Sequence, residues 1–104
     1  MKMKVVKNQG TQGDIFLQRI EKLPSGLRKK DEILARGEMT GHNHRVSGQA
    51  QVLVDEFGNQ FVNVTGEAQV IHEEHAPVTL SKGVFRVFRQ VEFDLVDEMR
   101  QVQD

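Results

Sequence analysis

The sequence predicts a small all-β protein, and two patterns indicate this class. Apolar and polar residues alternate in short runs from Ile15 to Leu95, which is typical of strands with one buried face. Glycines separate these runs at the expected turns. Their even spacing favours about seven to eight short strands in a single-domain barrel or sandwich over residues 1–104, since doubly wound folds need crossover helices for which there is no room.

Composition limits the classes of protein that this chain of 104 residues can form. With 38% hydrophobic and 28% charged residues, the chain has the balance of a soluble domain with one core. It has no cysteine, which excludes disulfides and thiolate metal ligands and leaves imidazole and carboxylate. A net charge of -1 argues against bulk nucleic-acid binding. The start, Met1–Asn8, lacks the apolar run of a secretory signal, so we expect a cytoplasmic protein without membrane contact.

Strand patterns follow one another along the chain. The expected strands are Ile15–Ile20, Ile33–Gly37, Gln49–Asp55, Phe61–Val64, Ala68–His72, Val78–Leu80 and Val84–Leu95. Gly13-Asp14 opens the first strand, and Leu23-Pro24-Ser25-Gly26 closes it with turn-forming residues. Phe57-Gly58-Asn59 is the expected tip of a hairpin, and Gly66 is expected to interrupt the strand that returns from it.

The pattern changes at the end of the last strand. Leu95, Val96, Met99 and Val102 recur at helical spacing, so the sequence predicts a short C-terminal helix there.

One charged residue interrupts the apolar row of the last strand. Phe85 and Val87 share a face with Arg89 under a period of two. Either a β-bulge near Arg89 turns it outward, or its guanidinium points inward to a partner. We predict that Arg89 is largely buried and paired with a carboxylate, Glu38 or Glu92 being the candidates.

The first motif that could carry chemistry is Gly37-Glu38-Met39-Thr40-Gly41-His42-Asn43-His44-Arg45. In extended backbone His42 and His44 project to the same face, which is a common way for a β scaffold to present two metal ligands. The alternative is a pair of polar residues on an exposed strand edge. The spacing is similar to the H-x-H segment of cupin barrels, but the next acid, Asp55, lies at the wrong distance along the chain.

The second motif is His72-Glu73-Glu74-His75-Ala76-Pro77. A spacing of three suits a strand end that turns into a loop, and Pro77 favours an extended exit. The zincin motif H-E-x-x-H differs, because its histidines lie four apart on a helix.

Both motifs together predict a site, because they contain all four histidines of the chain. Histidine titrates near neutrality and is a frequent metal ligand. We therefore expect the two clusters to meet in space. In that site His42, His44, His72 and His75 are candidate ligands of a divalent metal such as zinc, and the candidate catalytic groups are Glu38, Glu73, Glu74 and Arg89.

The chain resembles a family of short, uncharacterised bacterial and phage proteins. The shared stretches are Gly13-Asp14, Gly37 to His44, His72 to Val87, and Arg89-Gln90-Val91-Glu92-Phe93. This sequence departs from the family pattern at Phe85 and Phe93, where tyrosine is expected. The resemblance implies no particular activity, and it singles out Glu38, Thr40, His42, His44, His72, Glu73, Glu74, His75, Arg89, Gln90 and Glu92.

Three functions are compatible with these residues. The first is a metal-dependent hydrolase of a small phosphate or nucleotide ester, with a carboxylate as base and Arg89 on an anionic group. The second is metal-free acid/base cleavage of a phosphodiester by histidines. The third is a non-enzymatic accessory protein that binds a small anionic ligand or a protein partner.

Overall fold

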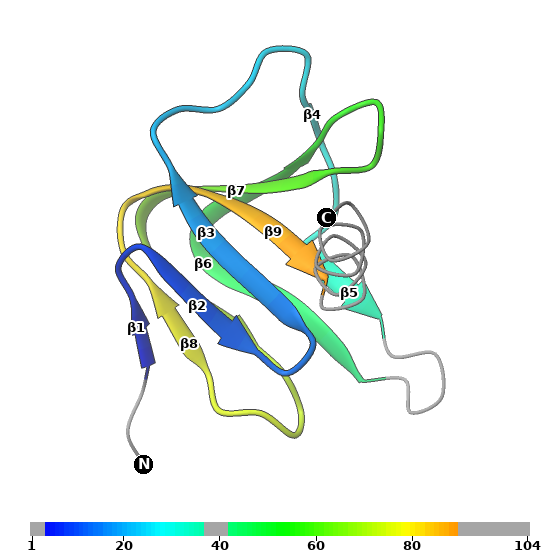
Figure 1. Cartoon of the computed structure of the whole chain (residues 1–104). Helices are drawn as coiled ribbons and strands as arrows, with labels where there is room; N and C mark the ends of the chain where they lie inside the picture. The colour runs from blue at the N-terminus through cyan, green and yellow to red at the C-terminus, as the bar shows by residue number, and fades with distance from the viewer. Residues whose placement is uncertain (1–3, 37–41, 90–104) are drawn as a thin grey trace, which may run out of the picture.

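The computed structural model describes residues 4–36 and 42–89, which form nine β-strands and no helix (Figure 1). The prediction of an all-β class is therefore confirmed for this part of the chain. The helix predicted after Leu95 lies outside the described residues. No helix in the described ranges is long and apolar enough to cross a membrane.

The strands, in chain order, are β1 (Lys4–Val6), β2 (Gln9–Gln12), β3 (Ile15–Ile20), β4 (Arg28–Lys29), β5 (Ile33–Arg36), β6 (Asn43–Val54), β7 (Gln60–Ile71), β8 (Val78–Leu80) and β9 (Gly83–Arg89). The bounds predicted for β3 and β8 are those observed. The prediction of short strands throughout is wrong, because β6 and β7 are each 12 residues long. Gly66 does not interrupt β7.

The strands form one sheet that branches at β7. One edge of β7 pairs with β6 along nearly its whole length. The other edge pairs first with β9, from Gln60 to Val64, and then with β8, from Ala68 to Val70. The order continues from β9 to β3 and β2, and from β8 to β1. No ladder among the described strands joins β1 to β2, so the sheet is not closed into a barrel as one predicted architecture required.

A β-bulge bends the two long strands. The pairing of β6 with β7 shifts register between Gly48 and Ala50, and such a bulge increases the local twist. Gly48 has φ +109°, and a Cβ there would lie 2.6 Å from the Glu67 carbonyl oxygen. Only glycine fits this close approach without strain. Gly48 and Ala50 pair with Ala68 and Val64, so the extra residues of the bulge lie on β7 around Gly66, opposite Gly48.

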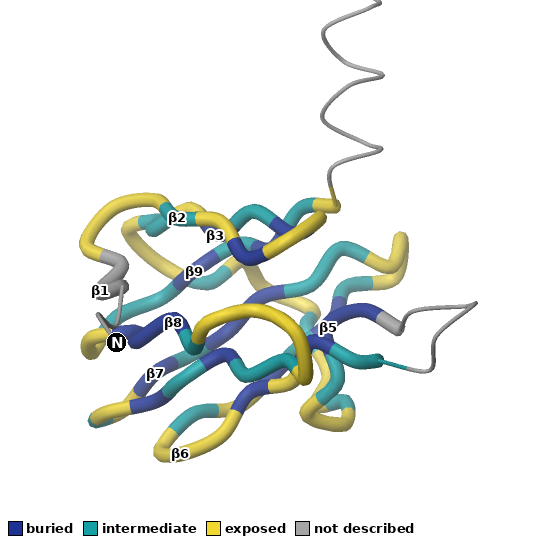
Figure 2. The backbone as a smooth tube through the Cα atoms, turned by 90° about the horizontal axis from the view of Figure 1, so that it is seen from below, coloured by how far each residue is buried: buried dark blue, intermediate teal, exposed yellow. Residues whose placement is uncertain are grey.

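Bending brings two parts of the sheet face to face, with β2, β3 and β9 over β6, β7 and β8 (Figure 2). The fully buried side chains between them are Ile15, Leu17, Val62, Val64, Val70, Val78, Leu80 and Phe85. Val52 and Val54 are buried on the face that alternation predicted, whereas Phe57 at the hairpin tip is 81% exposed. Period-two alternation therefore identified the core face correctly.

Arg89 is exposed, which contradicts the prediction of burial. No bulge precedes Arg89, since β3 and β9 pair without a register shift from Ile15–Arg89 to Ile20–Val84; the chain after Arg89 lies outside the described residues. Arg89 keeps the inward face of Val87, but β7 begins opposite Val87 and extends no further along β9. Among the described strands, no ladder covers Arg89 from that side. Its candidate partners Glu38 and Glu92 lie outside the described residues.

Candidate functional site

A tight turn between β2 and β3 forms one wall of the site. Gln12 pairs with Ile15, so Gly13-Asp14 is a two-residue hairpin loop. Gly13 has φ +57°, and Asp14 does not have a positive φ, since no non-glycine residue of the described ranges has one; this is the pattern of a type II′ turn. A Cβ on Gly13 would lie 2.6 Å from His75 Nε2 and 3.2 Å from His44 Cε1. The turn therefore packs directly against both histidine clusters.

The two histidine clusters meet, as predicted. Since Arg45 pairs with Ile71, the start of β6 lies beside the end of β7. The ring centroid of His72 is 4.4 Å from His44, 5.8 Å from His42 and 4.6 Å from His75. The rings of His44 and His75 stack at 5.9 Å. Four imidazoles from two distant segments thus form one group.

His44 is the buried centre of this group, with 4% of its surface exposed. Gln12 donates two hydrogen bonds of 2.9 Å, to the carbonyl oxygens of Val70 and Ala76. These bonds orient the amide so that Gln12 Oε1 faces His44 Nδ1 at 2.8 Å, and Nδ1 must therefore be the donor. On the other side, His44 Nε2 lies 2.8 Å from Asp14 Oδ1.

The protonation of His44 is set by competing influences. Burial lowers its pKa from 6.5, and the neighbouring His72 and His75 lower it further, whereas the hydrogen bond and the charge of Asp14 raise it. In the neutral ring Nδ1 holds the hydrogen, so the lone pair of Nε2 faces the Asp14 carboxylate. That contact needs a proton or another cation between the two atoms. Nε2 is thus the one nitrogen of His44 open to the predicted metal role.

Replacing Asp14 by asparagine is expected to lower the pKa of His44 further, because the carboxylate is the group that raises it. The asparagine amide can donate to neutral Nε2, so the contact survives in the neutral state. NMR titration of the four histidines in chelator-treated protein measures this pKa.

The sign of the accompanying effect on stability follows from linkage. The unfolded chain binds the His44 proton more readily than the folded chain, so stability is lost as pH falls below 6.5. An increase in the His44 pKa of the variant would contradict this account.

The loop after β7 carries the second cluster, and its backbone positions the side chains. The Glu74 amide donates to His72 Nδ1 at 3.0 Å, and the Asn43 amide donates to Glu73 Oε2 at 3.1 Å. Hydrogen bonds from its own amide and from the Asn43 amide lower the pKa of Glu73, and the charges of the nearby His42 and His72 lower it further. Glu73 is therefore an ionised group that holds this loop against the start of β6.

His42, His72 and Glu73 could hold a metal ion together. One ligand atom from each lies within 4.8 Å of the others. Ligands on one zinc ion lie roughly 3–4 Å apart, so a modest closure of the group would suffice. Glu74 Oε1 lies 3.1 Å from His42 Nδ1, so a second carboxylate stands beside this candidate ligand.

The predicted site residues divide into those near this group and those elsewhere. All four histidines, Glu73 and Glu74 lie in it, whereas Arg89 lines a separate cavity with no histidine in its lining. Glu38 lies outside the described residues. Sequence reasoning missed Gln12, and it saw Asp14 only as part of a turn. No local signal marks Gln12, because its partners Val70 and Ala76 lie far along the chain.

The chain was compared with known proteins. No curated protein and no solved structure matches it. A family model does match, over residues 11–90, a range that includes the β2–β3 turn and both histidine clusters. A family of unknown function is what the resemblance in the sequence implied, and the match confirms that much. Because the match spans more than half of the chain, the protein belongs to the family described as Domain of unknown function (DUF8820).

Proposed function

We propose that the protein binds a zinc-class divalent ion through His42, His72 and Glu73, and that the bound ion activates water to hydrolyse a small phosphate or nucleotide ester. The observation that carries this proposal is the set of three ligand atoms within 4.8 Å of one another. Two imidazoles and one carboxylate are a ligand set of hydrolytic zinc sites, and three protein ligands leave a fourth position for water.

Neighbouring groups support this assignment. Glu74 beside His42 Nδ1 resembles the carboxylate–histidine pairs that orient metal ligands, and its exposed carboxylate could also serve as the general base. His72 Nδ1 accepts a hydrogen bond from the Glu74 amide, so the neutral ring holds its hydrogen on Nε2. Metal binding must displace either that bond or that proton. Because a metal ion competes with protons for the imidazole nitrogens, we infer that affinity for zinc rises with pH.

The proposal extends to the setting of the protein. The resemblance to short bacterial and phage proteins supports a bacterial or phage origin.

Zinc binding can be measured by calorimetry on protein first treated with chelator. We expect one ion per chain, and His72→Ala or Glu73→Gln should weaken binding at least tenfold, because each removes one of three ligands. Glu67→Gln is the matched control, since Glu67 is an exposed acid on β7 that lies outside the group. Equal affinity of all variants for zinc would reject this site.

Hydrolysis is tested separately with an activated phosphodiester and an activated phosphomonoester. Activity that appears with zinc, disappears with chelator and is lost in Glu73→Gln supports the hydrolase. Activity that persists in chelator supports metal-free acid/base catalysis by the histidines instead.

One observation favours a second function, a non-enzymatic binding protein. Glu73, Glu74 and His75 are exposed, so much of the histidine group faces solvent, whereas most small-molecule sites are enclosed clefts. Zinc binding without hydrolysis across both substrate types would favour this function.

A further inference from the structure

We propose that a cavity between β5, the β6–β7 hairpin and the end of β9 binds a small molecule with an apolar body and one anionic group. The simplest example is a medium-chain carboxylate. The cavity has a volume of about 610 Å³, within the range of ligand-binding pockets. It is separate from the histidine group, and the inference does not depend on metal binding.

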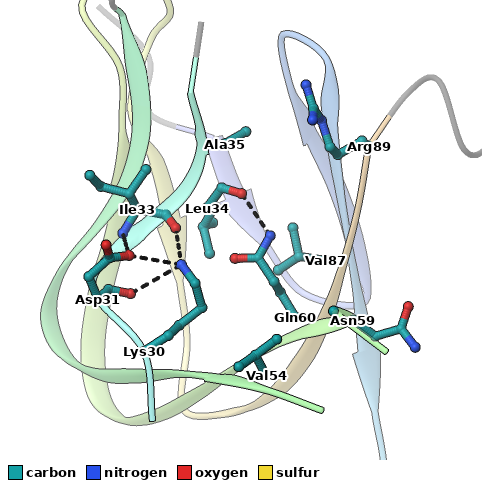
Figure 3. Close-up of a pocket in the computed structure, with 11 residues that line it drawn as sticks. Lys30, Asp31, Ile33, Leu34, Ala35, Val54, Asn59, Gln60, Val87 and Arg89 are labelled. Carbon is teal, nitrogen blue, oxygen red and sulfur yellow. Dashed lines mark hydrogen bonds and ion pairs between the residues drawn. The ribbon is translucent and has the colours of Figure 1, made fainter. Parts of the chain in front are cut away.

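The cavity exists because the strands diverge at this end. It lies between β5, the β6–β7 hairpin and the last residues of β9 (Figure 3). The pairing of β5 with β6 shifts register between Ile33 and Ala35. At this shift, the carbonyl oxygen of Leu34 accepts a hydrogen bond of 2.7 Å from Gln60 Nε2. This bond ties β5 to the start of β7 and gives the cavity a fixed wall.

Apolar side chains supply the surface that an aliphatic group would cover. They come from β5, β6 and β9 and are Ile33, Leu34, Ala35, Val54 and Val87. Burial of methylene groups against such a surface is favourable, so a chain of several carbons could bind without many polar contacts.

The charged residues that line the cavity determine which charge the polar group of the ligand should carry. Lys30 Nζ lies 2.9 Å from Asp31 Oδ1 and also donates to the Ile33 carbonyl oxygen, so its charge is already paired. Arg89 has no hydrogen bond or ion pair with any residue of the described ranges. Figure 3 shows its side chain on the opposite side of the cavity from Lys30. A guanidinium beside an apolar cavity favours a carboxylate or phosphate, which it can bind with two hydrogen bonds.

Two probes of equal length and opposite charge test this proposal. Octanoate and octylammonium are titrated separately into ¹⁵N-labelled full-length protein at low salt, with chelator present so that bound metal plays no part. We expect octanoate to shift the amide resonances of Leu34, Ala35, Gln60 and Val87, and to bind at least tenfold more tightly than octylammonium.

Arg89→Gln should weaken octanoate binding at least fivefold and leave octylammonium binding unchanged. Arg45→Gln is the matched control, since Arg45 is exposed on β6 and does not line the cavity, and it should bind octanoate as the wild type does. Equal binding of the two probes, no effect of Arg89→Gln, or resonance shifts confined to residues outside the cavity would each overturn the proposal. Loss of zinc binding would leave it intact.

Discussion

Replacing Phe85 by alanine is expected to lower the free energy of unfolding by about 3–5 kcal/mol. The side chain is fully buried between the facing parts of the sheet, and on β9 it lies opposite both Val62 of β7 and Arg19 of β3. The Arg19 guanidinium also lies 4.7 Å from the ring centroid. Truncation therefore leaves a cavity where three strands meet and removes a cation–π contact.

Urea unfolding followed by circular dichroism measures this loss. The control is Phe57→Ala, because Phe57 is 81% exposed at the β6–β7 hairpin tip, and its truncation should change stability by less than about 0.5 kcal/mol. A domain of this size has roughly 5–10 kcal/mol of stability, so Phe85→Ala should be only marginally folded. Similar midpoints for the two variants would mean that the core does not centre on β9.

The strands that alternation predicted are those whose one face is buried. In β3 and β8, apolar residues occupy the core positions, and the observed bounds match the predicted ones. The strands β2 and β4 were missed because their residues are polar or glycine, with no apolar alternation. They are held by pairing with β3 and β6, and backbone hydrogen bonds of this kind leave no pattern in side-chain polarity.

Strand length was predicted less well for a related reason. A glycine in a strand pattern indicates a bulge or a break, and the sequence alone does not distinguish the two. Gly66 was taken as a break, yet the strand β7 continues through it, and the extra residues of the bulge lie there, opposite Gly48 and Ala50. The close contacts of Gly48 with Glu67 and Ala68 depend on the register between β6 and β7.

The candidate site was predicted in part. The clustering of the four histidines in two motifs was enough to predict that they meet, and they do. The role of Gln12 could not be predicted, because its partners lie 58 and 64 residues further along the chain. Arg89 was predicted to be buried because alternation places it on the same face as Val87. Alternation does not show where the neighbouring strand begins, and β7 begins opposite Val87 and so does not reach Arg89.

Gln12→Leu is expected to cost about 3–5 kcal/mol of stability and to weaken zinc binding as well. Leucine has a similar size but makes no hydrogen bonds, so the Val70 carbonyl, the Ala76 carbonyl and His44 Nδ1 all lose their partner. Each buried polar group left without a partner costs roughly 1–3 kcal/mol.

Zinc binding should suffer because Gln12 ties the end of β7 to the loop that follows it. Its amide bridges Val70 to Ala76, and the candidate ligands His72 and Glu73 lie between these two residues. Without the bridge the loop has more freedom, so ordering the ligands around an ion costs more conformational entropy. Calorimetric titration with zinc, at a temperature where the variant is still folded, should show affinity reduced at least fivefold. The control is Gln18→Leu, an exposed glutamine on β3, which should keep both stability and affinity. If Gln12→Leu loses stability but binds zinc like the wild type, the bridge supports the fold alone and does not position the histidine group.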